Sequence, residues 1–117
     1  MSLFEIIRNE ASIAHRAGDV IFALGDAAHS MYVVAEGEVE IRIGDAVLDH
    51  LGPGGVFGEM ALVAGEKRSA NARAATDCRI VEISEKRFLF LVQQTPFFAL
   101  EVMRVLAARL RRHDPHP

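Results

Sequence analysis

The chain has 117 residues, of which half are apolar and a quarter are charged, a composition typical of a single globular domain and not of a disordered or fibrous protein. The formal net charge of -3 gives no general attraction to nucleic acid or to an anionic membrane, so an anionic ligand would need a local basic site. The single cysteine, Cys78, fits a reducing compartment, and the apolar start is interrupted by Glu5 and Arg8. We therefore expect a cytoplasmic protein with no membrane span.

Short strand-like runs separated by turn signals extend from Val20 to Ile83 and predict an all-β sandwich or barrel. The glycines at positions 52, 54 and 55 are interpreted as a turn, and residues 31–34 as strand core. Two stretches have apolar residues at every second position, which places one set on a buried face: Val39, Ile41 and Ile43, then Ala70, Ala72 and Ala74. Glu38, Glu40 and Arg42 should face water, and Val81 and Ile83 should continue the buried face.

After Ile83 the apolar spacing becomes helical. Ser84 is a candidate helix cap for a first helix over about 84–93, and Thr95 followed by Pro96 predicts a second helix over about 95–112. One apolar face of the second helix is predicted to cover the β domain: Ala99, Val102, Met103, Leu106 and Leu110. The basic cluster Arg109, Arg111 and Arg112 is interpreted as interacting with the helix dipole and solvent.

The segment from Val56 to Ala70 carries the chemistry of the chain. Gly58 allows close approach of the backbone to a ligand, and the residues from Glu59 to Val63 could form one helical turn with N–H groups directed at an anion. Arg68 supplies a guanidinium that matches two phosphate oxygens, and Ser69 adds a hydroxyl donor. A carboxylate beside a phosphate site is useful if it accepts a hydrogen bond from a sugar hydroxyl. Together these groups indicate a sugar phosphate ligand.

The run Phe57-Gly58-Glu59-Met60-Ala61-Leu62, followed by Arg68-Ser69-Ala70, resembles the phosphate-binding cassette of the cyclic-nucleotide-binding domain family. The resemblance extends over most of the chain and implies a mostly β fold with flanking helices: a double-stranded β-helix, or jelly-roll-like β-roll, over about 17–84, followed by the two C-terminal helices as one domain. It also implies that Glu59 holds the ribose 2′-OH and Arg68 the cyclic phosphate, with Gly58, Ala61 and Ser69 adding contacts around the phosphate.

By this resemblance the chain is expected to be a regulatory sensor of cAMP or cGMP that signals through its terminal helix. Ser69 can donate to the phosphate or contact a guanine amino group, so the sequence does not decide between adenine and guanine. It slightly favours cAMP. A homodimer through the terminal helix is a further expectation. No helix-turn-helix follows Arg112, so direct DNA binding is not expected. The segment before Ala17 is shorter than is usual in the family.

Two other functions share features with this sequence. A module of the same fold that binds a protein and no longer binds nucleotide remains an alternative, although Glu59 and Arg68 are both present. A metal enzyme of cupin type needs clustered histidines and a carboxylate, whereas His29 and His50 lie apart in the sequence. We therefore expect no catalysis, no metal and no cofactor beyond the nucleotide ligand, and the sequence does not indicate the output partner.

Overall fold

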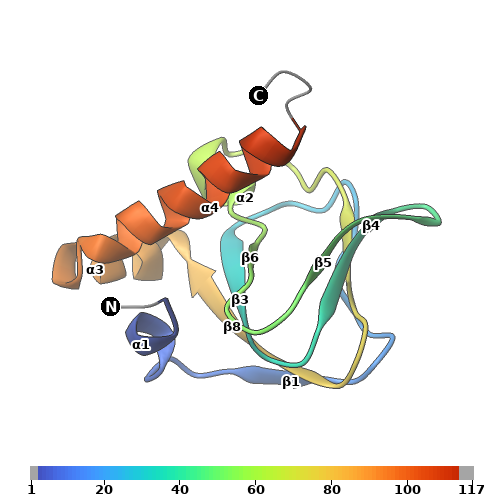
Figure 1. Ribbon diagram of the computed structural model, residues 1–117, viewed down its shortest axis with the longest axis horizontal. Coiled ribbons are helices and arrows are strands. Elements are labelled where there is room, and N and C mark those ends of the chain that lie inside the picture. The colour runs from blue at the N-terminus through green and yellow to red at the C-terminus, as the bar shows by residue number, and fades with distance from the viewer. Residues whose placement is uncertain (1–2, 114–117) are drawn as a thin grey trace.

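The computed structural model describes residues 3–113. Eight strands lie between one N-terminal helix and two C-terminal helices, with a short helix after the sixth strand (Figure 1). The elements in chain order are α1 (Leu3–Ile7), β1 (Ile13–His15), β2 (Val20–Phe22), β3 (Ser30–Glu36), β4 (Val39–Ile43), β5 (Ala46–Leu51), β6 (Val56–Phe57), α2 (Met60–Val63), β7 (Asn71–Ala74), β8 (Cys78–Ser84), α3 (Glu85–Gln94) and α4 (Phe97–His113).

The strands form two antiparallel sheets of four strands each. The first sheet has the order β1-β8-β3-β6 and the second has the order β2-β7-β4-β5. Helices α3 and α4 lie on one side of this β-roll (Figure 1). The predicted β-roll followed by two C-terminal helices is therefore confirmed. Helix α1 and strand β1 precede the region in which the sequence indicated structure.

Both faces of β3, an inner strand of the first sheet, are buried, which explains its nearly continuous apolar run. Met31 and Val33 pack in a core with residues of α1, α3 and α4, such as Phe98. Val34 points the other way, into a second core that also contains Ala72 and Ala74 of the second sheet. The predicted burial of the alternating alanines is confirmed. Their small side chains allow the two sheets to approach closely.

The alternation predicted for β4 holds only at its start. Val39 is fully buried, but Ile43 is 48% exposed, and Glu40 and Arg42 are half-buried and form an ion pair. The register between β4 and β5 shifts between Ile41 and Arg42. An irregularity of this kind bends the strand, so the end of the β4–β5 hairpin leaves the core.

Helix α3 begins as predicted, because the Ser84 hydroxyl accepts a hydrogen bond of 3.1 Å from the Arg87 backbone N–H. The predicted buried face of α4 is partly wrong. Phe98 and Val102 are buried against the roll, whereas Met103 and Leu110 are 60% and 73% exposed. Among the described residues, no single helix is long and apolar enough to cross a membrane; α3 and α4 reach that length only together, across a bend of 118°.

Candidate functional site

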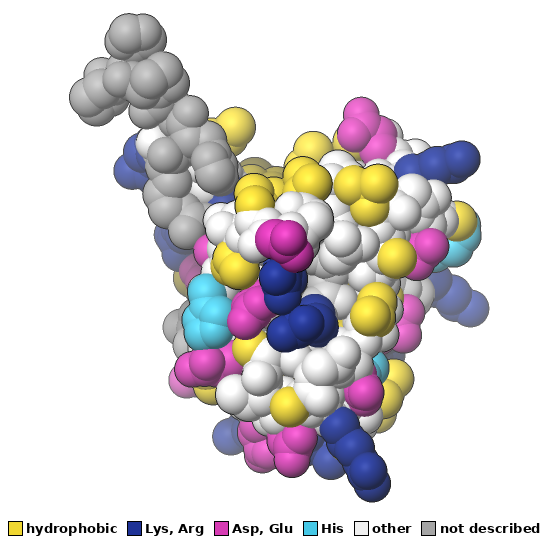
Figure 2. Space-filling model, turned by 90° about the vertical axis from the view of Figure 1, so that its right-hand side faces the viewer, with side chains coloured by type: hydrophobic (Ala, Val, Ile, Leu, Met, Phe, Trp, Pro, Cys, Tyr) yellow, Lys and Arg dark blue, Asp and Glu magenta, His cyan; other side chains and the backbone are white. Residues whose placement is uncertain are grey.

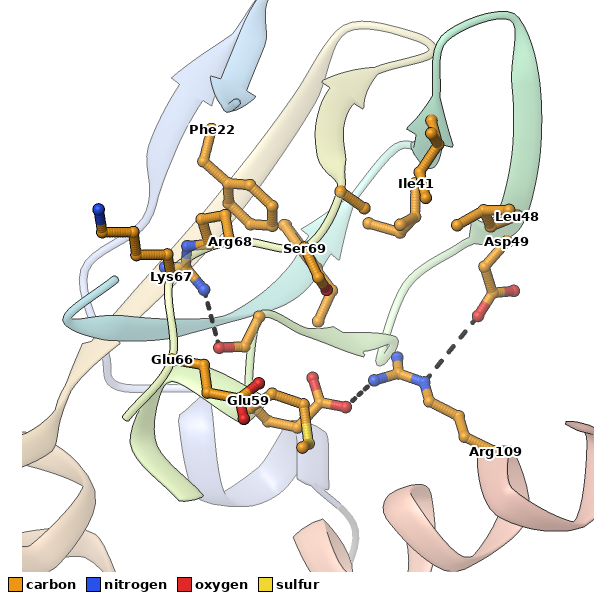
Figure 3. A pocket seen from close by; sticks show the side chains of 15 residues that line it. Phe22, Ile41, Leu48, Asp49, Glu59, Glu66, Lys67, Arg68, Ser69 and Arg109 are labelled. Atoms are coloured by element: carbon orange, nitrogen blue, oxygen red, sulfur yellow. Dashed lines mark hydrogen bonds and ion pairs between the residues drawn. The ribbon is translucent and has the colours of Figure 1, made fainter. Parts of the chain in front are cut away.

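A cavity of about 480 Å³ opens between the second sheet, the segment 57–70 and the C-terminal part of α4. Basic and acidic side chains lie next to each other near the centre of the face shown in Figure 2, with hydrophobic side chains around them. The close-up in Figure 3 shows that apolar side chains such as Ile41 and Leu48 line one end, while Lys67 and Arg68 lie at the other. The cavity thus has a basic end at Lys67 and Arg68, and an opposite wall in which Ile41 and Leu48 are apolar.

The segment from Phe57 to Asn71 joins the two sheets. It leaves the first sheet at the end of β6, forms the single turn of α2, and enters the second sheet at β7. Gly58 makes the first bend with φ of +73°, a conformation that favours glycine. A Cβ atom at this position would lie 2.7 Å from Nη1 of Arg68 and 3.2 Å from the Tyr32 ring. Both the backbone conformation and the crowding therefore favour glycine here.

Arg68 is a buried cation without a carboxylate partner among the described residues. It is 7% exposed, and its guanidinium donates to the backbone carbonyls of Gly58 at 2.9 Å and Ser30 at 2.7 Å. The guanidinium carbon lies 4.2 Å from the centroid of the Phe22 ring. The Nε of Arg68 is buried without a hydrogen-bond partner. Because carbonyl dipoles and ring faces offset a full charge only in part, this end of the cavity favours an anion.

Tyr32 completes the aromatic surroundings of Arg68. Its ring stacks on Phe57 with centroids 5.2 Å apart and lies near Phe22. Burial raises the pKa of the Tyr32 phenol, and Glu82 raises it further, while Arg68 acts in the opposite direction. The phenol is therefore neutral at physiological pH, and it leaves the charge of Arg68 uncancelled.

Glu59 is also buried, with an exposed fraction of 3%, but its charge is compensated. Its Oε1 accepts a hydrogen bond from Nη1 of Arg109, which reaches across from α4 (Figure 3). Nη2 of Arg109 donates to the carbonyl of Val56, and Nε lies 3.9 Å from Oδ2 of Asp49. A buried carboxylate is stable only when it is paired in this way.

Most of the residues predicted for the site line this cavity: Phe57, Gly58, Glu59, Met60, Arg68, Ser69 and Ala70. Leu62 instead packs against the core under the helices. The side chain of Ala61 lies outside the described part of the structure. The cavity therefore collects the charged members of the predicted cassette.

Sequence reasoning did not assign the part of the wall that comes from distant elements: Phe22, Ile41, Ile43, Leu48, Asp49 and Arg109. It also did not assign Glu66 and Lys67, which lie within the segment 57–70 itself. The assignment of Arg109 to the helix dipole and solvent was wrong, because its guanidinium points into the cavity. A usable signal was its helical spacing from the buried Phe98 and Val102, which puts it on the face toward the roll. Asp49 gave no signal of its own.

Among residues 3–113, no group of three or more His, Cys, Asp or Glu side chains could hold a metal ion. Within that part of the chain, Cys78 is buried and burial raises the pKa of its thiol, as do Asp19 and Asp77. A protonated, buried thiol is a poor nucleophile.

Residues 13–95 match the cyclic nucleotide-binding domain family. The chain belongs to this family. A cyclic nucleotide-gated potassium channel of Mesorhizobium japonicum is 38% identical over 93% of this chain and 30% of its own length. The cyclic AMP receptor protein of Thermus thermophilus is 36% identical over 83% of this chain and 47% of its own. The chain therefore spans less than half of each of these relatives.

Solved structures of the family have the same fold. The catabolite activator protein of Thermus thermophilus superposes with a TM-score of 0.81 at 32% identity, covering 92% of this chain and 53% of that chain. A structure from work on a cyclic-GMP-dependent signalling pathway that regulates bacterial phytopathogenesis superposes with a TM-score of 0.82 at 30% identity, covering 97% of each chain. The proteins to which this cyclic nucleotide-binding domain is similar thus include one named for cyclic AMP and one from work on cyclic GMP.

Proposed function

We propose that this domain is a sensor that binds cAMP or cGMP in the cavity beside Arg68 and passes ligand occupancy to α4. The observation that carries the proposal is the buried, unpaired charge of Arg68, whose Nε lacks a hydrogen-bond partner. A cyclic phosphate has one negative charge and two exocyclic oxygens, so it supplies both the charge and the acceptors that Arg68 lacks. Ser69 and the backbone at Gly58 line the same end.

The sugar is placed at Glu59 in this proposal. Arg109 binds Oε1 of this carboxylate, so a ribose 2′-OH would donate to Oε2. The base then extends toward the apolar wall of Ile41 and Leu48. Helix α4 contributes Arg109 to the same cavity, which gives the ligand a direct means of changing the stability of the packed α4. A lean to cAMP and a cytoplasmic location remain predictions from the sequence.

We also propose that the domain does no chemistry on its ligand and that it forms dimers through α4. The first proposal is supported by the buried, protonated Cys78 and by relatives that are regulators and channels. The second is supported by the exposed apolar side chains that α4 leaves uncovered. Direct DNA binding is not proposed for the described residues, and the output partner is unidentified.

The test is calorimetric titration of the domain with cAMP and with cGMP. We expect binding that is lost, or weakened at least a hundredfold, in Arg68→Ala, because a buried charge-assisted contact contributes about 3 kcal/mol or more. Arg68→Lys keeps the charge without the fork and should bind weakly. Arg73→Ala is the matched control, because Arg73 is exposed on β7.

Since Arg68 also donates to Gly58 and Ser30, each variant needs a thermal unfolding curve beside its titration. Binding that survives in a folded Arg68→Ala protein would contradict the proposal. Absence of heat with both nucleotides, in folded wild-type protein, would instead favour the module of the same fold that binds a protein partner.

A further inference from the structure

The guanidinium of Arg109 contacts three separate elements of the roll. Nη1 faces Glu59 before α2, Nη2 donates to the Val56 carbonyl of β6, and Nε faces Asp49 of β5 (Figure 3). Glu59 and Val56 belong to the segment that follows the glycine turn, whereas Asp49 belongs to the β4–β5 hairpin. Asp49 therefore links this hairpin to helix α4.

The carboxylate of Asp49 is oriented before any ligand arrives. Its Oδ1 accepts a hydrogen bond of 2.9 Å from the backbone N–H of His50, and its Oδ2 lies 3.9 Å from Nε of Arg109. The side chains of Asp49 and Arg109 are 18% and 21% exposed. An ion pair that is shielded from water to this degree is screened less by salt than a pair on the open surface.

Arg109 would be held less firmly without Asp49. Its remaining carboxylate partner, Glu59, is the group that the proposed function assigns to the ribose. A ribose hydroxyl on Oε2 would share the charge of Glu59 with Arg109, which is bound to Oε1. The second anion, Asp49, on another side of the guanidinium then helps to keep Arg109 in the cavity. The other charged side chains of the cavity, Glu66 and Lys67, lie on the side of Glu59 away from Arg109 (Figure 3).

We propose that Asp49 is a positioning residue of the ligand site, which holds Arg109, and with it the end of α4, against the occupied cavity. The inference rests on the proposed function, since it assumes that a cyclic nucleotide binds there. Asp49 lines the cavity beside Leu48, and in this proposal it acts through Arg109 and not on the base. Removing the Asp49 carboxylate therefore weakens the binding of cAMP and the binding of cGMP by the same factor.

The experiment compares Asp49→Asn with wild-type protein in titrations with cAMP and cGMP. We expect affinity for both nucleotides to fall about two- to fivefold, the range for a partly exposed ion pair, and the loss to shrink as salt is raised. Asp49→Glu should recover most of the affinity, because it retains the charge. Asp45→Asn is the matched control: it removes the same charge from an exposed turn of the same hairpin and should leave affinity unchanged.

A double-mutant cycle separates positioning from direct contact. In an Arg109→Gln background, Asp49→Asn should cause no further loss, because the partner through which it acts is gone. Additive losses, a loss confined to one nucleotide, or unchanged affinity in Asp49→Asn would each overturn the inference while wild-type binding upholds the proposed function. Wild-type protein that binds neither nucleotide would overturn the proposed function and the inference with it.

Discussion

Gly58 has a backbone conformation that favours glycine, and it lies directly against the proposed phosphate-binding residue Arg68. Its φ of +73° already disfavours a side chain, and a Cβ would press on the Arg68 guanidinium at 2.7 Å. We expect Gly58→Ala to lower the free energy of unfolding by about 1–3 kcal/mol and to weaken nucleotide binding, because Arg68 must move. Urea denaturation and calorimetry measure the two effects.

Gly44 provides the control for this substitution. It also has a positive φ, of +56°, but a Cβ there meets no atom within 4 Å. Gly44→Ala should therefore cause a backbone cost of about 1 kcal/mol and leave binding unchanged. Equal effects of the two substitutions on affinity would show that crowding of Arg68 is unimportant.

The sequence was informative for Glu59 and Arg68 because a single short segment carries both, and local spacing is visible in a sequence. It was uninformative for Asp49 and misleading for Arg109. The ion pair between Arg109 and Glu59 joins residues 50 positions apart, and only the packing of α4 on the roll brings them together. A charged residue near the end of a helix is usually solvated. The sequence alone therefore favoured a solvated Arg109.

At the scale of elements, α4 has two apolar faces, and this is why its buried face was predicted only in part. One face packs on the roll through Phe98 and Val102. The other leaves a stripe exposed at intervals of three, four and three residues: Leu100, Met103, Ala107 and Leu110. The sequence pattern merges the two faces, since both repeat with helical period. The exposed spacing is that of a coiled-coil seam.

The proposed dimer can be tested on this stripe. We expect the wild-type domain to self-associate in sedimentation equilibrium at micromolar concentration, and Met103→Glu to be monomeric, because a carboxylate buried in the seam would be unpaired. Leu89→Glu is the control, since it adds the same charge at an exposed apolar position of α3. Wild-type protein that sediments as a monomer at all concentrations would contradict the dimer.

At the scale of the whole molecule, binding and stability should be coupled. A ligand that binds only the folded state stabilises it by about 2.7 kcal/mol at a hundred times its dissociation constant. For a domain of this size, that corresponds to a rise in melting temperature of roughly 10 °C. Differential scanning calorimetry with cAMP or cGMP checks this, and linear AMP, which lacks the cyclic phosphate, should give a much smaller rise. Equal shifts with AMP would contradict a site built for the cyclic form.

The cassette between Phe57 and Asn71 is also one of the covalent connections between the two sheets. A nucleotide held there would act as a reversible cross-link. It would restrain local opening of the two sheets relative to each other. Amide hydrogen exchange would then slow in both sheets at once. In a cell, empty copies would open more often and be degraded sooner, so the abundance of the domain would itself follow the level of its ligand.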